Sequence, residues 1–160
     1  MLAVGGDELL QHAVPSHRID LGGCCVLPGL TDAHMHFEWF SLGLQRIDAD
    51  QPSCDQVLAL VAQQAQTSPK GSWIRGHGWN HNAWGAGDLP TRDLLDRVAP
   101  DHPVFLTAKS GHASWANSRA LQLADVSAST VDPADGAIVR DATGRPTGVF
   151  LEGASDLVGS

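Results

Sequence analysis

The spacing of apolar residues along the chain gives the first indication of its secondary structure. Within residues 53–68 apolar side chains recur three or four positions apart, the period of an α-helix with one buried face; they are Val57, Leu60, Val61 and Ala65. Ser53 has the side chain of a helix N-cap, and the pattern stops at Pro69, Lys70 and Gly71. We therefore predict a clear amphipathic helix in this part of the chain.

Shorter patterns predict two further helices. One is expected at residues 91–99, where Thr91 can serve as the N-cap. The other is expected in the segment "NSRALQLA", begun by either Ser114 or Asn117. Residues 37–50 give no clear period, and we expect them to lead into a loop.

Runs of β-branched and apolar residues predict strands between these helices. Residues 1–28 contain short β segments, and the longer expected strands are residues 30–36, 72–79, 102–108 and the two arms of a hairpin at 136–152. The hairpin is expected to turn at "DATG". Strands that alternate with helices in this way favour an α/β domain whose strands are mainly parallel.

Composition and charge limit the classes of partner molecule that we expect the chain to bind. The 160 residues are 42% hydrophobic and 18% charged, which suits one domain with a proper core. The formal net charge of −8 repels a phosphate backbone, so nucleic acid is not an expected partner. No apolar run approaches the ~20 residues of a membrane helix, and the first residues do not form a signal peptide. Three cysteines, two of them adjacent, favour reduced thiols in a cytoplasmic protein.

Polar residues alternate in the expected strand "LTDAHMH", residues 30–36. Successive side chains of a strand point to opposite faces, so Asp32, His34 and His36 would share one face. Two imidazoles held in this way can bind one divalent ion, and a nearby carboxylate can orient a ligand. Because a His-x-His pair also occurs by chance in many proteins, a merely polar strand end is the alternative.

Five segments, taken together, resemble the amidohydrolase superfamily of metal-dependent hydrolases. They are "LPGLTDAHMH", "GHGWNHNAW", "LPTRDLLDRVAPDHPVFL", "GHASWANSRALQLA" and "GAIVRDATGRPTGVFLEGA". Their order and spacing resemble the amidohydrolase-3 branch, which includes N-substituted formamide deformylases. The resemblance covers nearly the whole chain.

This resemblance implies a particular domain organisation. Residues 29–160 would be the first strands and helices of a (β/α)₈ TIM-type barrel, with an insertion. Residues 1–28 would end the N-terminal segment of a small β-sandwich. A whole barrel needs roughly 250 residues, so we expect an N-terminal fragment of the family fold, in which Met1 is an internal methionine.

The resemblance also implies a metal site, most plausibly for one or two zinc ions. His34 and His36 are the expected first ligands, and Glu152, at the end of the last expected strand, is the expected third. Asp32 is expected to orient a metal ligand without binding the metal itself. No catalytic residue is expected within the chain itself, since the aspartate that transfers the proton would lie beyond Ser160.

Other polar and aromatic residues have competing interpretations. His112 is expected to contact substrate, with a loop histidine that anchors its own backbone as the alternative. Trp79 is expected to line an apolar substrate pocket, although core packing is the simpler explanation. Lys109 is expected to be a surface lysine rather than a carbamylated metal ligand, and His102 is expected to lie on the surface.

The function implied by the resemblance is hydrolysis of a carbon–nitrogen bond outside peptides, such as an amide or formamide, by a metal-activated water. The chain alone is expected to be inactive and prone to aggregate. The expected partners are a small amide-like substrate and, for the full-length protein, a second copy; no membrane is expected. The alternative is a non-catalytic zinc- or ligand-binding module, in which His34 and His36 belong to a closed site with four protein ligands.

Overall fold

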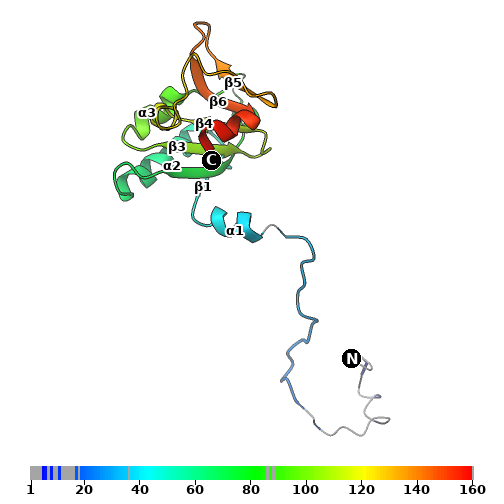
Figure 1. Cartoon of the computed structure of the whole chain (residues 1–160). Coiled ribbons are helices and arrows are strands. Elements are labelled where there is room, and N and C mark those ends of the chain that lie inside the picture. Colours follow the sequence, from blue (N-terminus) through cyan, green and yellow to red (C-terminus); the bar gives the residue numbers. More distant parts are fainter. Residues whose placement is uncertain are drawn as a thin grey trace. The chain divides into compact units, whose positions relative to one another are not determined.

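The structure is a computed structural model that describes residues 5–6, 8, 11, 17, 19–35, 37–85, 87 and 89–159. It divides the chain into two units, residues 1–35 and 36–160, and each unit is described by itself (Figure 1). No helix within the described ranges is long and apolar enough to cross a membrane.

The described part of the first unit contains no β-strand. Residues 19–35 are irregular and exposed, so the β segments predicted within 19–28 and the strand predicted at 30–36 are both wrong for the residues described there. The carboxylate of Asp32 accepts a hydrogen bond from the backbone N of His34, at 3.0 Å. This local turn competes with extended pairing, which explains why an alternating pattern does not produce a strand. The predicted shared face of Asp32 and His34 is therefore not found.

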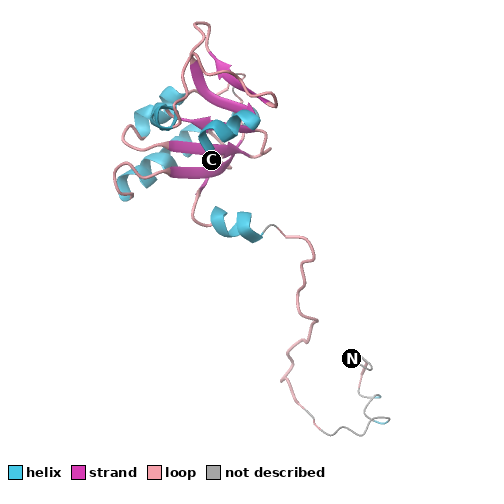
Figure 2. Cartoon of the chain, in the orientation of Figure 1, coloured by secondary structure: helices cyan, strands magenta, loops and turns pink. Residues whose placement is uncertain are grey.

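A mixed six-stranded sheet forms the centre of the second unit (Figure 2). The strands are β1 (Ile47–Asp48), β2 (Ile74–Trp79), β3 (Val104–Ala108), β4 (Ala113–Ala116), β5 (Gly136–Arg140) and β6 (Pro146–Glu152). Their order across the sheet is β1-β2-β3-β4-β6-β5. The mixed α/β class and the hairpin of β5 and β6 confirm the prediction from sequence.

The strand directions correct the prediction of a mainly parallel sheet. Two pairings, β1 with β2 and β2 with β3, are parallel, whereas the other three pairings are antiparallel. The reason is β4, which the sequence prediction missed. Only residues 109–112 separate β3 from β4, and a parallel crossover needs a dozen or more residues. As a result β1, β2, β3 and β6 all run in the same direction, and their carboxyl ends share one edge of the sheet.

Seven short or medium helices accompany the sheet in the described part of the chain. They are α1 (Phe37–Gly43), α2 (Cys54–Thr67), η2 (His81–Trp84), α3 (Arg92–Val98), α4 (Ser118–Leu123), η3 (Gly153–Ser155) and α5 (Asp156–Gly159). Helix α2 confirms its prediction, and its N-cap Ser53 accepts a hydrogen bond from Gln56 N at 3.3 Å. Helix α1 corrects the predicted loop, because seven residues are too few to show a helical period.

Hydrophobic side chains cover both faces of the sheet. In β3, Val104 and Leu106 pack with α2 and α3 on one face, whereas Phe105 packs with α4, η3 and α5 on the other. This follows from the alternation of side chains along a strand. Trp79 and Trp115 are fully buried on the first face, with an edge-to-face contact whose ring centroids are 6.2 Å apart.

The start of α4 is fixed by a buried asparagine. Asn117 Oδ1 accepts hydrogen bonds from Ala120 N and from Val104 N, both at 3.0 Å, and its Nδ2 donates to Ala99 O at 3.2 Å. One side chain therefore caps α4 and ties it to β3 and α3. Of the two predicted starts, Asn117 is correct, and Ser114 lies within β4.

His102 corrects another prediction, because it is buried rather than on the surface. Only 5% of the residue is exposed, and its ring Nδ1 donates a hydrogen bond to Ser72 O at 3.0 Å. The backbone carbonyl satisfies the polar ring, so the burial costs little.

Candidate functional site

Charged side chains gather at the carboxyl ends of the strands that run in the same direction. Asp50 follows β1, Lys109 follows β3, and Glu152 ends β6. The ammonium of Lys109 donates to the carboxylate of Asp50 at 2.6 Å, which connects the loops after β1 and β3. In α/β folds with parallel strands, ligands and catalytic side chains occupy this edge. We therefore take this edge as the candidate site.

His112 and Glu152 form a pair at the same edge. His112 immediately precedes β4, which runs opposite to β3, so it lies at the end where β3 and β6 finish. The backbone N of Glu152 donates to His112 O at 2.9 Å. The side chains also meet, with His112 Nδ1 2.9 Å from Glu152 Oε2. Both side chains are more than half exposed, so a ligand can reach them from solvent.

The backbone of Glu152 adopts a conformation that residues other than glycine rarely use. Its φ is 49° and its ψ is −134°. Such a conformation costs about 1–3 kcal/mol, and it persists only where the surroundings impose it. Here Gly153 N donates to Asp135 O at 3.1 Å, and a Cβ on Gly136 would collide with the backbone of Ala154. Strain of this kind concentrates at functional sites, which supports a role for Glu152 beyond the fold.

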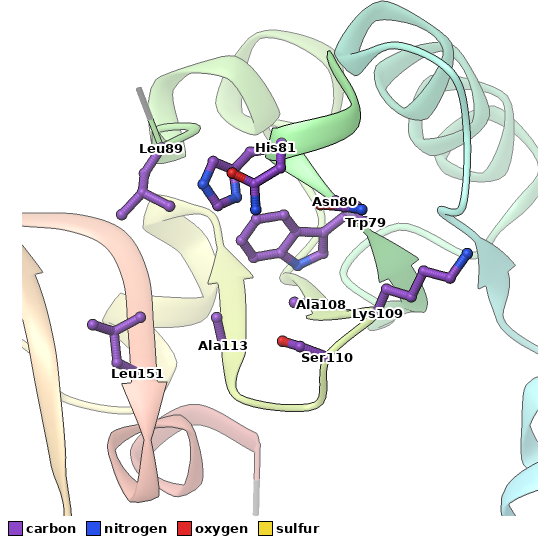
Figure 3. A pocket seen from close by; sticks show the side chains of 10 residues that line it. Trp79, Asn80, His81, Leu89, Ala108, Lys109, Ser110, Ala113 and Leu151 are labelled. Carbon is purple, nitrogen blue, oxygen red and sulfur yellow. The ribbon is translucent and has the colours of Figure 1, made fainter. Parts of the chain in front are cut away.

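A cavity of about 430 Å³ opens near the ends of β2, β3 and β6 (Figure 3). Its apolar wall is formed by Trp79, Leu89, Ala113 and Leu151, and its polar wall by Asn80, His81, Asn82, Lys109 and Ser110. Ala113 and Leu151 are partners in the pairing of β4 with β6. Since His112 and Glu152 are their neighbours in the chain, the pair lies next to the cavity.

Trp79 takes part in both the core and the cavity. Only 1% of the residue is exposed, and its indole N–H donates to Leu106 O at 2.9 Å inside the protein. Figure 3 shows its ring at the side of the cavity. The prediction that Trp79 contacts substrate stays a prediction, while its burial agrees with the simpler explanation of core packing.

The structure brings together some of the residues predicted for the site and leaves others apart. His112 and Glu152 are in contact, a link that the sequence prediction did not make. Asp32 and His34 belong to the first unit, and His36 lies outside the described residues. Their predicted roles as metal ligands and ligand support stay predictions.

Asp50 and Lys109 are the residues that sequence reasoning missed as a pair. They are 59 positions apart, so no local pattern links them. A signal was nevertheless present for Lys109, which directly follows the mostly apolar strand "VFLTA", whereas Asp50 follows a strand of only two residues, Ile47–Asp48. Charged residues at the ends of successive parallel strands are expected to meet at one edge of the sheet.

A divalent metal would find suitable donors in the pair of His112 and Glu152. Imidazole nitrogen and carboxylate oxygen are both common zinc ligands. Within the ranges that the structure describes, no group of three or more His, Cys, Asp or Glu side chains could hold a metal ion. The pair therefore fits a metal in its chemistry but supplies only part of a ligand set.

The sequence matches a protein-family profile and several known proteins. A profile of the amidohydrolase family matches residues 18–160. The chain is 38% identical to the N-substituted formamide deformylase of Arthrobacter pascens, over 96% of this chain and 29% of that protein. It is 38% identical to the putative amidohydrolase YtcJ of Bacillus subtilis (strain 168), over 89% of this chain and 27% of that protein.

A protein of Arabidopsis thaliana and a solved structure also match the chain. The chain is 39% identical to the protein LONG AFTER FAR-RED 3 of Arabidopsis thaliana, over 88% of this chain and 24% of that protein. A crystal structure of an uncharacterized metal-dependent hydrolase from Pyrococcus horikoshii OT3 superimposes with a TM-score of 0.55 and 25% identity. That match covers 79% of this chain and 22% of the hydrolase. The chain thus spans about a quarter to a third of the length of the proteins it matches.

Proposed function

Because this chain belongs to the amidohydrolase family, we propose that it supplies part of the active site of a metal-dependent hydrolase. The proposed reaction is hydrolysis of a carbon–nitrogen bond other than a peptide bond, such as that of an amide or formamide. The observation that carries the proposal is the contact between His112 and Glu152 at the carboxyl edge of the sheet, beside a cavity. The sheet would then be the first part of a (β/α)₈ barrel, with residues 1–28 in a β-sandwich.

The proposed metal ligands are His34, His36 and Glu152, and zinc is the proposed ion. Glu152 uses Oε2 to contact His112, which leaves Oε1 for a cation. A divalent ion bound there would lower the pKa of a bound water and polarise the carbonyl of the substrate. Asp32 would orient the two histidines, as carboxylates commonly do behind metal-bound imidazoles.

The residues of this chain would contribute positioning and recognition. When Nδ1 of His112 carries the proton, it donates to Glu152 and fixes the direction of the carboxylate. The opposite ring nitrogen, Nε2, then accepts a hydrogen bond from a polar group of the substrate. The wall of Trp79 and Leu151 would hold an apolar part of the substrate and keep water away from it.

The ligand assignment is tested by metal analysis of the intact protein that contains this chain. We expect Glu152→Gln and His34→Ala each to lose metal and to lose hydrolysis of N-substituted formamides by about 10- to 100-fold or more. Glu38→Gln, a carboxylate of the exposed helix α1, is the matched control and should keep both. Full metal content in both site variants would remove these residues from the metal site. Tightly bound metal without any amide hydrolysis would instead favour a non-catalytic zinc module.

A further inference from the structure

A second cavity, of about 480 Å³, opens on the other side of Lys109. It shares Ala108, Lys109 and Ser110 with the cavity of Trp79, so the two cavities lie side by side. Its remaining walls include Arg46, His77 and Thr107. Figure 3 shows the side chain of Lys109 extending away from Leu89 and Leu151, the apolar wall of the first cavity.

The second cavity is rich in hydrogen-bond donors and positive charge. Arg46 and Lys109 bring a guanidinium and an ammonium to its wall, and Thr107 and Ser110 bring hydroxyl groups. None of the residues described as lining it is an aspartate or a glutamate. In a chain with a formal net charge of −8, a concave site with this lining favours an anionic ligand.

Arg46 is the cation of this cavity that is available to a ligand. The turn after α1 holds its backbone, since Arg46 N donates to Gly43 O at 3.1 Å. Within the described ranges no carboxylate lies within ion-pair distance of its guanidinium. Arg46 also acts on Arg75, because burial first and then the charge of Arg46 lower the pKa of the Arg75 guanidinium. A planar guanidinium matches the two oxygens of a carboxylate.

The charge balance suits a ligand with one negative charge. Asp50 neutralises Lys109 through their contact at 2.6 Å, which leaves Arg46 as the net positive charge of the cavity. A carboxylate would neutralise that charge, whereas a phosphate dianion would leave an excess of negative charge. The other cavity lies directly alongside, with its apolar wall of Trp79 and Leu151.

We propose that the cavity lined by Arg46 and Lys109 binds the carboxylate of an amide substrate whose apolar group occupies the cavity of Trp79. This assignment rests on the proposed hydrolase function and names its substrate class, an amide that carries both an apolar group and a carboxylate. Arg46 is then a specificity-determining residue, and a neutral analogue of the same shape binds more weakly.

The binding test uses the intact protein that contains this chain and two probes of nearly the same shape, one an anionic carboxylate and the other a neutral amide. Phenylacetate and phenylacetamide share the same ring, and calorimetric titration measures the affinity of each. We expect phenylacetate to bind about tenfold more tightly or better, and Arg46→Gln to remove that preference without weakening phenylacetamide. Arg46→Lys keeps the charge and should keep most of the preference. Arg119→Gln is the control, because Arg119 is exposed on α4 and bonds to Gln122.

Each possible result of the titration either supports or overturns the assignment of the cavity to a carboxylate. Equal affinities for the two probes, or a preference that survives Arg46→Gln, would overturn it. Inorganic phosphate that binds more tightly than phenylacetate would assign the cavity to a free anion and would also overturn it. The titration needs neither metal nor turnover, so it is independent of the hydrolase test. A phenylacetate preference in a protein that cleaves no amide would contradict the proposed hydrolysis and leave the anion cavity standing.

Discussion

Glu152 combines an unfavourable backbone conformation with a contact that holds its side chain. A glutamate at a φ of 49° and a ψ of −134° is strained, whereas glycine adopts this region without penalty. Its carboxylate meanwhile contacts the ring of His112. Glycine would be the more stable residue at this position, so we attribute the presence of glutamate to a role of its side chain.

This strain leads to a prediction about two substitutions at one position. Glu152→Gly should unfold at a higher urea concentration than Glu152→Gln, by about 1 kcal/mol in the free energy of unfolding, because only glycine relieves the backbone. Both variants lack the carboxylate and should lose metal equally. A glycine variant less stable than the glutamine variant would contradict the strain.

The sequence identified individual site residues but not their partners. His112 and Glu152 were both predicted for the site, because they lie in segments that resemble the family. Their contact spans 40 positions, and the contact of Lys109 with Asp50 spans 59. Such pairs depend on the order and direction of strands, which no local pattern contains. Arg46 was missed for the same reason, since its cavity is assembled from three separate loops and strands.

At the scale of the element, the spacing of apolar residues predicted the helices and strands that local interactions stabilise. Helix α2, strands β2 and β3 and the hairpin of β5 and β6 were all predicted. Strand β4 and helix α1 were missed because four and seven residues carry too little pattern. The predicted strand at residues 30–36 was wrong for the residues described there, because the hydrogen bond from His34 N to the Asp32 carboxylate forms a local turn that competes with strand pairing.

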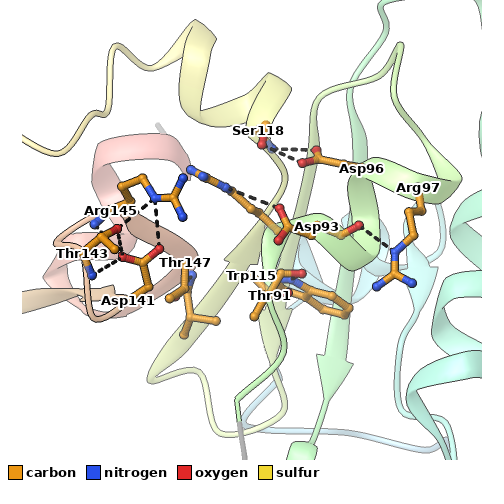
Figure 4. Close-up of polar contacts among 12 residues, drawn as sticks. Thr91, Asp93, Asp96, Arg97, Trp115, Ser118, Asp141, Thr143, Arg145 and Thr147 are labelled. Carbon is orange, nitrogen blue, oxygen red and sulfur yellow. Dashed lines mark hydrogen bonds and ion pairs between the residues drawn. The ribbon is translucent and has the colours of Figure 1, made fainter.

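The turn of the hairpin depends on one ionised carboxylate (Figure 4). Asp141 Oδ1 accepts hydrogen bonds from Thr143 N at 2.8 Å, from Thr143 Oγ1 at 2.6 Å and from Arg145 N at 3.1 Å. The hydrogen bond from the Thr143 side chain is the main reason that the pKa of Asp141 lies well below its ordinary value of 3.8, and the contacts with Arg145 add to it. The folded turn therefore favours the charged form of this side chain.

This depressed pKa predicts a pH-dependent effect of Asp141→Ala. The stabilisation by Asp141 is complete above pH 3.8 and is lost as the pH falls from there toward the pKa of the folded state. The variant should thus unfold more easily than the unaltered chain at pH 7, and the difference should shrink below pH 3.8. Urea unfolding at several pH values measures it. A difference that stays constant down to pH 2 would show that the charge is not involved.

At the scale of the whole molecule, the second unit exposes apolar side chains that a soluble surface rarely carries. Phe37 is 65% exposed and Phe40 is 62% exposed on α1, and Leu44 follows them in the chain. Exposed apolar groups this close together favour association with another surface. The sequence analysis expected the chain to aggregate through open strand edges, but it could not locate this apolar surface because α1 was not predicted.

This surface predicts how the chain behaves when it is purified alone. We expect concentration-dependent association, seen by light scattering, and a marked reduction in the double variant Phe37→Lys, Phe40→Lys. Val131→Lys is the control, because Val131 is 83% exposed but lies away from α1 in the sequence. Association that is equal in all three proteins would exclude α1 as its cause.

The reversed strand β4 also has a consequence for the order in which the chain folds. Residues 109–112 alone connect β3 to β4, and residues 141–145 alone connect β5 to β6, so these pairs close short loops. The parallel pairs of β1 with β2 and β2 with β3 must close much longer loops, each across a helix, at a greater cost in chain entropy. The hairpins β3–β4 and β5–β6 should therefore form before either parallel pair. The contact of His112 with Glu152 joins one hairpin to the other across 40 positions, and the contact of Asp50 with Lys109 spans 59, so both contacts form only when the hairpins join the rest of the sheet.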